Sequence, residues 1–201
     1  MARLAIFVDG AYLDSLSKYE FDVNIDLEKF ANAVKDEVAS ATPEPIDLLR
    51  TLYYNCPPYQ SNSPTVEERE RYAKFRRFAD ALKYLKRFEF REGRLQMKGY
   101  DRDGKPIFQQ KRIDVLLGLD FGLLSGKRAI SHIALVAGDS DFIPAVQVVK
   151  PEGVSVWLFH GPRFSRGDGR PTYHLDLWQE ADERFEINKA FLLRCAKTLP
   201  E

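Results

Sequence analysis

Two carboxylates stand one residue apart in the stretch LVAGDSDF, residues 135 to 142, at the end of an apolar run. These are Asp139 and Asp141. A third acid, Asp9, follows another apolar run in FVDG, and a fourth, Asp114, stands early in the apolar segment QQKRIDVLLGLD. Carboxylates that converge repel one another unless a cation lies among them or some become protonated. If the four side chains meet, they form a candidate cation site.

Oxygen ligands without His or Cys favour Mg²⁺ or Mn²⁺. Such an ion lowers the pKa of a water molecule and neutralises charge that develops on a phosphoryl oxygen. The chemistry that fits these residues is therefore hydrolysis of a phosphodiester. This hypothesis gives the same four residues both the catalytic and the metal-binding role: Asp9, Asp114, Asp139 and Asp141.

Each acid also has a simpler structural interpretation. Asp141 would cap the helix that follows it, since Asp is a favoured N-cap residue. Asp9, which precedes a glycine, would be an ordinary residue between a strand and a loop. Asp114 would be a surface residue if the helix has another phase. Asp120, six positions after Asp114, is rotated by about 120° on a helix and is a weaker candidate for the same cluster.

The elements that would position these acids alternate between strands and helices. Short apolar runs that predict buried strands are residues 4–8, 48–54, 132–137 and 154–159. Helical patterns cover residues 26–39, 65–87, 111–124, 141–150 and 179–197. This alternation predicts a parallel α/β sheet, whose ligand crevice lies beyond the carboxyl ends of the strands. Residues 88–110 predict antiparallel strands around a turn at Asp103-Gly104.

Composition limits the class of protein. The chain has 201 residues, of which 44% are hydrophobic, and we expect one domain, residues 1–201. Thirty basic residues balance thirty acidic ones, so net charge favours no partner. Two distant cysteines, Cys56 and Cys195, indicate neither a disulfide framework nor a zinc site. With no signal peptide or membrane span in the pattern, we expect a cytoplasmic protein that does not bind membranes.

Three motifs in order, FVDGAYL, KRIDVLLGLD and HIALVAGDSDFIPAVQVVKPEGVSVWLF, resemble the NYN domains, a branch of the PIN-like metal-dependent ribonucleases. The resemblance covers nearly the whole chain. It implies a three-layer α/β sandwich with a mainly parallel central sheet, and an endonuclease that cleaves RNA with Mg²⁺ or Mn²⁺ at the four acids. Lys111 matches a basic residue of the family and would contact a phosphate, unless it is simply a solvated lysine. Tyr12 is a departure, because members usually carry Asn there.

Local charge supports RNA, single-stranded or structured, as the partner. From Arg69 to Arg94 the sequence has ten basic and four acidic residues. Basic side chains there, among them Arg76 and Arg77, would neutralise phosphates, unless they simply form a solvated helix face. Residues 160–174 combine arginines with aromatic residues and glycines, as single-strand binding requires, although a disordered surface loop also fits. Its candidate RNA contacts are Arg163 and Arg166.

Two alternatives to a ribonuclease stay open. One is a catalytically weak or inactive RNA-binding or regulatory NYN module, for which Tyr12 is the hint. The other is a phosphohydrolase of the haloacid-dehalogenase type, which needs an acid two residues after the nucleophilic Asp, where this chain has Ala11. The oligomeric state is also open, and a homo-oligomer is compatible with the sequence.

Overall fold

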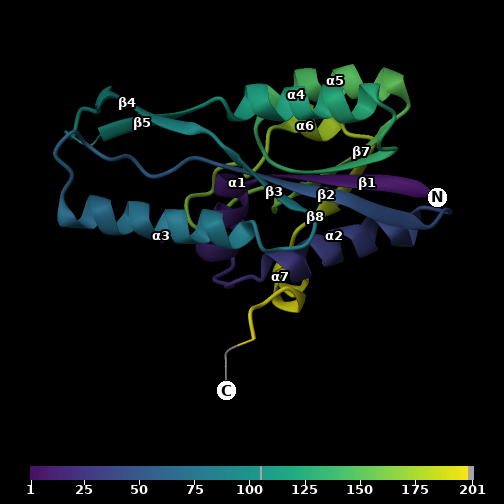
Figure 1. The fold of residues 1–201 in the computed structure, drawn as a ribbon, viewed down its shortest axis with the longest axis horizontal. Coiled ribbons are helices and arrows are strands. Elements are labelled where there is room, and N and C mark those ends of the chain that lie inside the picture. Colours follow the sequence, from purple (N-terminus) through teal and green to yellow (C-terminus); the bar gives the residue numbers. More distant parts are fainter. Residues whose placement is uncertain (105, 199–201) are drawn as a thin grey trace.

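A computed structural model of the chain describes residues 1–104 and 106–198. Its centre is a six-stranded sheet in the order β3-β2-β1-β6-β7-β8, and every neighbouring pair is parallel (Figure 1). The strands are β1 (Ala2–Asp9), β2 (Ile46–Asn55), β3 (Phe88–Glu92), β6 (His132–Val136), β7 (Ser155–His160) and β8 (Glu183–Glu186). The prediction of an α/β fold with a mainly parallel central sheet is confirmed.

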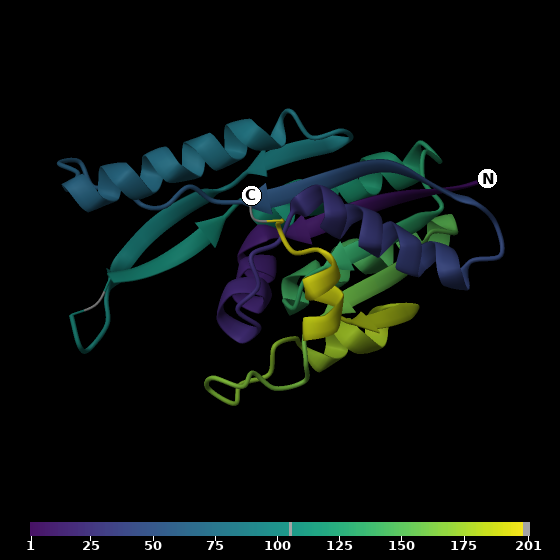
Figure 2. The same cartoon turned by 90° about the horizontal axis from the view of Figure 1, so that it is seen from below.

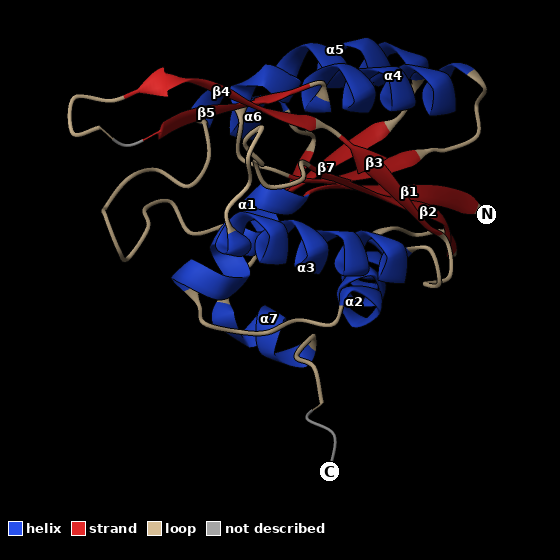
Figure 3. Ribbon diagram, turned by 60° about the vertical axis from the view of Figure 1, so that its left-hand side comes forward, coloured by secondary structure: helices blue, strands red, loops and turns tan. Residues whose placement is uncertain are grey.

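Helices cover both faces of the sheet, which makes three layers (Figure 3). One layer consists of α4 (Ile113–Gly126), α5 (Ile143–Val149) and α6 (Leu175–Glu180). The opposite layer contains α1 (Gly10–Asp14), the π-helical turn η1 (Ser15–Glu20), α2 (Leu27–Ala41), α3 (Val66–Leu82) and α7 (Lys189–Arg194). Within residues 1–104 and 106–198, every helix is too short or too polar to cross a membrane.

The first strand shows why its sequence is continuously apolar. Leu4, Ile6 and Val8 belong to the core under α2 and α7, whereas Ala5 and Phe7 belong to the core under α4 and α5. All five side chains are at most 1% exposed. A strand covered on both faces loses the alternation of apolar and polar residues. The same reason explains the other central strands.

Two sequence-based predictions of secondary structure are wrong in part. The helix predicted for residues 179–197 is instead the end of α6, the edge strand β8 and α7. The strand forms because Asp182 accepts a hydrogen bond from the N–H of Val156 (2.8 Å) and Phe185 packs on Phe159 (5.2 Å between ring centres). The helix predicted for residues 65–87 ends at Leu82, followed by turns and a left-handed Arg87 (φ 63°).

The segment after α3 also divides differently from the prediction. β3 joins the edge of the parallel sheet beside β2. Only β4 (Arg94–Tyr100) and β5 (Pro106–Lys111) form the antiparallel hairpin. This hairpin and α3 extend beyond the same end of the sheet, as Figure 2 shows from below. Tyr59 and Phe108 connect the loop before α3 to the hairpin, with their ring centres 5.3 Å apart.

Candidate active site

Asp9 is the last residue of β1 and the N-cap of α1. Its Oδ1 accepts hydrogen bonds from the N–H groups of Ala11 (3.0 Å) and Tyr12 (3.2 Å). The pKa of this carboxyl is nevertheless raised from 3.8 to about 6, mainly by burial and to a smaller extent by the negative charges of Asp139 and Asp114. A buried carboxylate of this kind is costly to ionise without a nearby cation.

The neighbouring strand β6 brings the second group of acids to the same edge. Val8 of β1 is in register with Val136 of β6, so the two parallel strands end side by side. Asp139 is the N-cap of the single turn η2 (Ser140–Phe142) and accepts a hydrogen bond from the N–H of Asp141 (3.1 Å). The cap is therefore Asp139 and not Asp141, because Asp139 still has extended backbone whereas Asp141 is already inside the turn.

Asp114 lies in the first turn of α4, opposite the ends of these strands. The helix begins after Arg112, whose left-handed backbone (φ 78°) turns the chain out of the β4–β5 hairpin. Partial burial raises the pKa of Asp114, and the charges of Asp141 and Asp139 raise it further. The side chain is exposed, as the surface interpretation requires, yet it lies within electrostatic reach of the other acids.

The four acids thus meet at one edge of the sheet, which we call the acidic edge: Asp9, Asp114, Asp139 and Asp141. In the part of the chain that the structure describes, no group of three or more His, Cys, Asp or Glu side chains is arranged to hold a metal ion. The chemistry of the four side chains fits a hard divalent cation, since all four are carboxylates. In two of the acids, Asp9 and Asp139, one carboxylate oxygen accepts hydrogen bonds from backbone N–H groups.

Asp120 has a different role from Asp114, although both lie on α4. Its carboxylate accepts hydrogen bonds from the hydroxyl of Tyr54 (2.8 Å) and from Nε of Arg91 (2.8 Å). These contacts join α4 to β2 and β3. Asp120 is therefore a structural residue, in agreement with its weaker ranking from helix phase.

Tyr12 holds two loops of the acidic edge together. Its hydroxyl accepts a hydrogen bond from the N–H of Gly161 after β7 (2.8 Å). Its ring lies against Gly138, where an added Cβ would be 2.6 Å from the ring and 2.3 Å from the carbonyl oxygen of Thr172. Burial raises the pKa of Tyr12 to about 12, so the phenol stays neutral. Tyr12, which stands where the family usually has Asn, is thus a packing residue beside the GDSD motif.

Sequence reasoning missed the residues behind Asp9. At Gly10 an added Cβ would lie 2.5 Å from the ring of Tyr53 and 2.8 Å from the side-chain nitrogen of Asn55. Only glycine fits this contact, and it brings the amide of Asn55 close to the backbone that carries Asp9. The signal in the sequence is the position of Asn55 at the end of β2, next to β1 in the sheet.

The five predicted RNA contacts are distributed over separate surfaces. Lys111 is exposed at the end of β5, and its charge acts on Asp114. Arg76 is bound by both oxygens of Glu92 (2.5 and 2.9 Å), so its charge is already paired. Arg77 is exposed on α3, and within the described residues we find no ion pair for it.

The arginines of residues 160–174 belong to a loop that is held in place. Arg163 stacks on Phe164, with its guanidinium 5.4 Å from the ring centre. The backbone N–H of Arg166 donates to the carboxylate of Glu20 in η1 (3.0 Å), and Ser165 donates to the same carboxylate (2.9 Å). This segment is therefore anchored to the helix layer and does not behave as the simple surface loop that the sequence suggested.

A parallel α/β sheet with acids gathered at its carboxyl edge is an arrangement found in nuclease-like proteins of the PIN-like class. The family model of the NYN domain matches residues 3–168, and the chain belongs to this family. NYN domains are nuclease-like and generally act on RNA, and PIN-like nucleases generally use divalent metal ions. All four residues of the acidic edge fall within the matched range.

Two further comparisons give partial matches. The chain is 41% identical over 81 residues to the uncharacterised protein y4oD of Sinorhizobium fredii (strain NBRC 101917 / NGR234), a match of 40% of this chain and 36% of that protein. The chain therefore spans little more than a third of this relative. Among solved structures, UDP-GlcNAc 2-epimerase from Methanocaldococcus jannaschii aligns with a TM-score of 0.45 at 11% identity, over 96% of this chain and 42% of that chain.

Proposed function

We propose that the protein is a metal-dependent ribonuclease that hydrolyses internal RNA phosphodiester bonds at the acidic edge. One observation carries the proposal: acids from the ends of β1 and β6 and from the first turn of α4 lie near enough for their charges to add to the burial that raises the pKa values of Asp9 and Asp114. In a chain of the NYN family, such a cluster is most simply explained as a cation site. The preferred ions are Mg²⁺ and Mn²⁺.

Under this proposal the chain's own residues position the reactants. Asp9, Asp114, Asp139 and Asp141 would hold the ion, which when bound supplies an activated water and neutralises charge on the phosphate. The backbone bonds to Asp9 and Asp139 fix these two carboxylates before any ion arrives. The cation of Lys111, at the mouth of the site, would attract the phosphate.

A second candidate is an RNA-binding NYN module that has lost turnover. The observation that favours it concerns Tyr12, at a position where the family usually has Asn. The hydroxyl of Tyr12 accepts a hydrogen bond from the N–H of Gly161 and so has a structural role. The nearby amide of Asn55 would have to supply any polar contact that Asn makes in other members. Under both candidates, we expect the protein to bind RNA in the cytoplasm.

The location of the two cysteines supports a reducing compartment as part of the same proposal. Cys56 belongs to the core on the α4 face of the sheet, and Cys195 to the core on the α2 face. Both are free thiols. The sheet between them prevents the two from pairing without unfolding.

The decisive experiment is cleavage of a labelled single-stranded RNA by the purified protein in Mn²⁺, Mg²⁺ or EDTA. Asp139→Asn is the test variant, because Asn caps a turn as well as Asp but carries no charge. Asp120→Asn is the matched control, since it removes a carboxylate from the same protein outside the acidic edge. Metal-dependent cleavage that only Asp139→Asn abolishes supports a ribonuclease. Binding without cleavage in every metal would favour the second candidate.

A further inference from the structure

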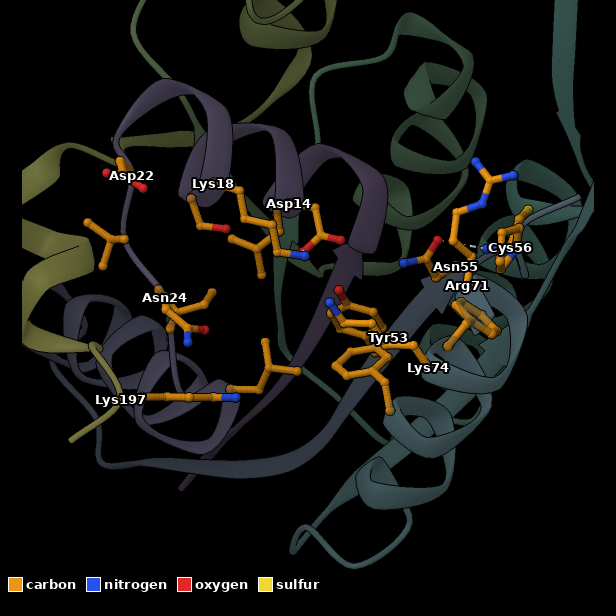
Figure 4. A pocket seen from close by; sticks show the side chains of 18 residues that line it. Asp14, Lys18, Asp22, Asn24, Tyr53, Asn55, Cys56, Arg71, Lys74 and Lys197 are labelled. Carbon is orange, nitrogen blue, oxygen red and sulfur yellow. Dashed lines mark hydrogen bonds and ion pairs between the residues drawn. The ribbon is translucent and has the colours of Figure 1, made fainter. Parts of the chain in front are cut away.

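A groove of about 810 Å³ lies beside the acidic edge, between η1 with its following loop and α3 (Figure 4). We call it the η1–α3 groove. The ring of Tyr53 forms part of its floor, and Asn55 and Cys56 form the end nearest β1. Pockets of roughly 300–1,000 Å³ are the size that binds small or extended ligands. None of the predicted RNA contacts lines this groove.

Cations from three distant segments line the groove. They are Lys18 of η1, Arg71 and Lys74 of α3, and Lys197 of the C-terminal segment. The last is positioned by its backbone N–H, which donates to the carbonyl of Asn24 (2.9 Å). Convergence of four cations in a protein with zero net charge is a local electrostatic feature that favours anionic ligands.

Two acids also line the groove, and they do not cancel its charge. Asp14 forms an ion pair with Lys18 (2.9 Å) on η1. Asp22 lies at the far end, in the loop after η1. The lining therefore keeps an excess of two positive charges, four cations against two acids.

Aromatic side chains give the α3 wall an apolar surface between the cations. Phe75 packs edge-on against Phe90 (5.9 Å between ring centres), and Phe78 packs edge-on against Tyr53 (5.6 Å). Both phenylalanines are only half-buried, so part of each ring faces the groove. Alternation of cations with aromatic rings is the surface on which unpaired bases stack while their phosphates are neutralised.

The spacing along α3 explains why these four residues share a wall. Arg71, Lys74, Phe75 and Phe78 are related by three, four and seven positions, which places them on one face of a helix. Arg77 falls outside this set. The face of α3 that lines the groove thus carries Arg71 and Lys74 beside two aromatic rings, whereas the sequence hypothesis singled out Arg76 and Arg77.

The inner end of the groove lies next to the strand end that carries Asp9, because Asp9 is in register with Tyr54 and the two flanking residues, Tyr53 and Asn55, line the groove. Asn55 and Tyr53, which line it, also pack against Gly10, the residue after Asp9. Burial is the main cause that raises the pKa of Cys56 to about 11, and the charges of Asp9 and Asp114 add to it. A ligand that lies along α3 therefore ends close to the strand end that carries Asp9.

We propose that the η1–α3 groove binds single-stranded RNA and leads it to the acidic edge, with Arg71, Lys74 and Lys197 on its phosphates and Phe75 and Phe78 against its bases. The direction toward the acids rests on the proposed ribonuclease function. The occupant is single-stranded because exposed aromatic rings stack on unpaired bases, whereas the bases of a duplex are already stacked on one another.

The test is the affinity of the full chain for a fluorescent single-stranded RNA, measured by anisotropy in EDTA so that nothing is cut. The test variant is the double substitution Arg71→Gln with Lys74→Gln. The matched control is Lys127→Gln with Lys189→Gln, which removes two exposed cations outside the groove. Equal thermal midpoints of the two double variants show that both are folded.

Each phosphate contact to a single strand contributes about 0.7 to the slope of log affinity against log salt. Loss of two contacts should reduce that slope by about 1.4 and weaken binding roughly 25-fold at 0.1 M salt. The control should stay within about threefold of wild type. The same RNA annealed to its complement should bind weakly and be insensitive to the groove variant. Equal losses in both double variants, or a duplex that loses as much as the single strand, would overturn the proposal.

Cleavage in Mn²⁺ separates this inference from the proposed function. If the groove variant raises KM and leaves kcat unchanged, both hold. RNA that binds through the groove but is never cut contradicts the ribonuclease and leaves the groove intact. Cleavage with an unchanged KM in the groove variant contradicts the groove and leaves the ribonuclease intact.

Discussion

Two carboxylates of the acidic edge are fixed by the backbone, whereas the cations of the η1–α3 groove stand on long side chains. Asp9 and Asp139 each cap a turn that begins where a central strand ends. In the groove, by contrast, Lys74 and Lys197 come from a helix and a C-terminal segment 123 positions apart (197 minus 74) and depend on no common turn. The first region is suited to holding a reacting group in place, and the second to following a flexible chain.

This contrast decides which substitutions are informative in each region. At the acidic edge, Asp→Asn removes charge and preserves the cap, so a loss of function is not a loss of structure. In the groove, charge acts additively and without fixed geometry, so pairs of cations have to be removed. The predictions below address the acidic edge, where the expected effects are larger, in order of decreasing size.

The largest effect is expected from Asp114→Asn, since Asp114 is within electrostatic reach of all three other acids. We expect cleavage to fall on the order of a hundredfold or more, because stabilisation by a bound ion contributes several kcal/mol to such a reaction. Initial rates in saturating Mn²⁺ measure the change. Asp120→Asn, six residues along the same helix, should retain nearly full activity, and an equal loss there would point to a general defect of α4.

The second effect concerns stability and pH in EDTA. The folded-state pKa of Asp9 is raised to about 6 from 3.8 in the unfolded chain, so the folded state binds the proton more tightly. Wild-type stability should therefore fall as pH rises through the window from about 4 to about 6. Asp9→Asn removes this loss and should stabilise the protein at pH 7 by up to about 3 kcal/mol. Urea unfolding at pH 3.5 and pH 7 checks this, and a gain of equal size at both pH values would contradict it.

A third effect is expected at the contact between Gly138 and Tyr12. Gly138→Ala puts a methyl group 2.3 Å from the backbone oxygen of Thr172, which cannot move freely. Overpacking of this kind costs about 1–3 kcal/mol, and the GDSD loop should shift and lose activity as well. Gly122→Ala is the matched control, because nothing lies within 4 Å of its added Cβ in α4. That change should stabilise the helix by roughly 1 kcal/mol.

The smallest effect is expected from Tyr12→Phe. The ring and its packing on Gly138 remain, but the buried N–H of Gly161 loses its acceptor. An unpaired buried donor costs on the order of 1 kcal/mol or somewhat more. Thermal unfolding measures the loss, while the Mn²⁺ concentration at half-maximal activity should be unchanged. A large shift in that concentration would mean that the phenol touches the ion site directly.

Much of the fold follows from local patterns in the sequence. The runs that became β1, β2, β6 and β7 are apolar because both faces of each strand are covered, and parallel strands necessarily end at one edge. The acids that follow β1 and β6 are therefore brought together by topology alone. The predicted convergence of Asp9 with Asp139 needed no information about distant contacts.

The remaining features depend on distant partners. The strand β8 is a short, polar edge strand that exists because Asp182 bonds to β7, and its residues alone resemble a helix. Arg76 is an attractive phosphate ligand in the sequence, yet Glu92, sixteen residues later, has already paired with it. The groove likewise requires Lys197 and α3 to line the same pocket. Such contacts depend on tertiary packing, and the local periodicity of the sequence does not predict them.

The central claim, that the acids are crowded to hold a cation, is tested most directly by Mn²⁺ binding without any RNA. The free Mn²⁺ signal in electron paramagnetic resonance can be titrated with wild type, Asp114→Asn and Asp120→Asn. We predict that wild type and Asp120→Asn remove Mn²⁺ from solution equally, whereas Asp114→Asn binds at least tenfold more weakly. Equal binding by all three proteins, or no binding by wild type, would contradict the account.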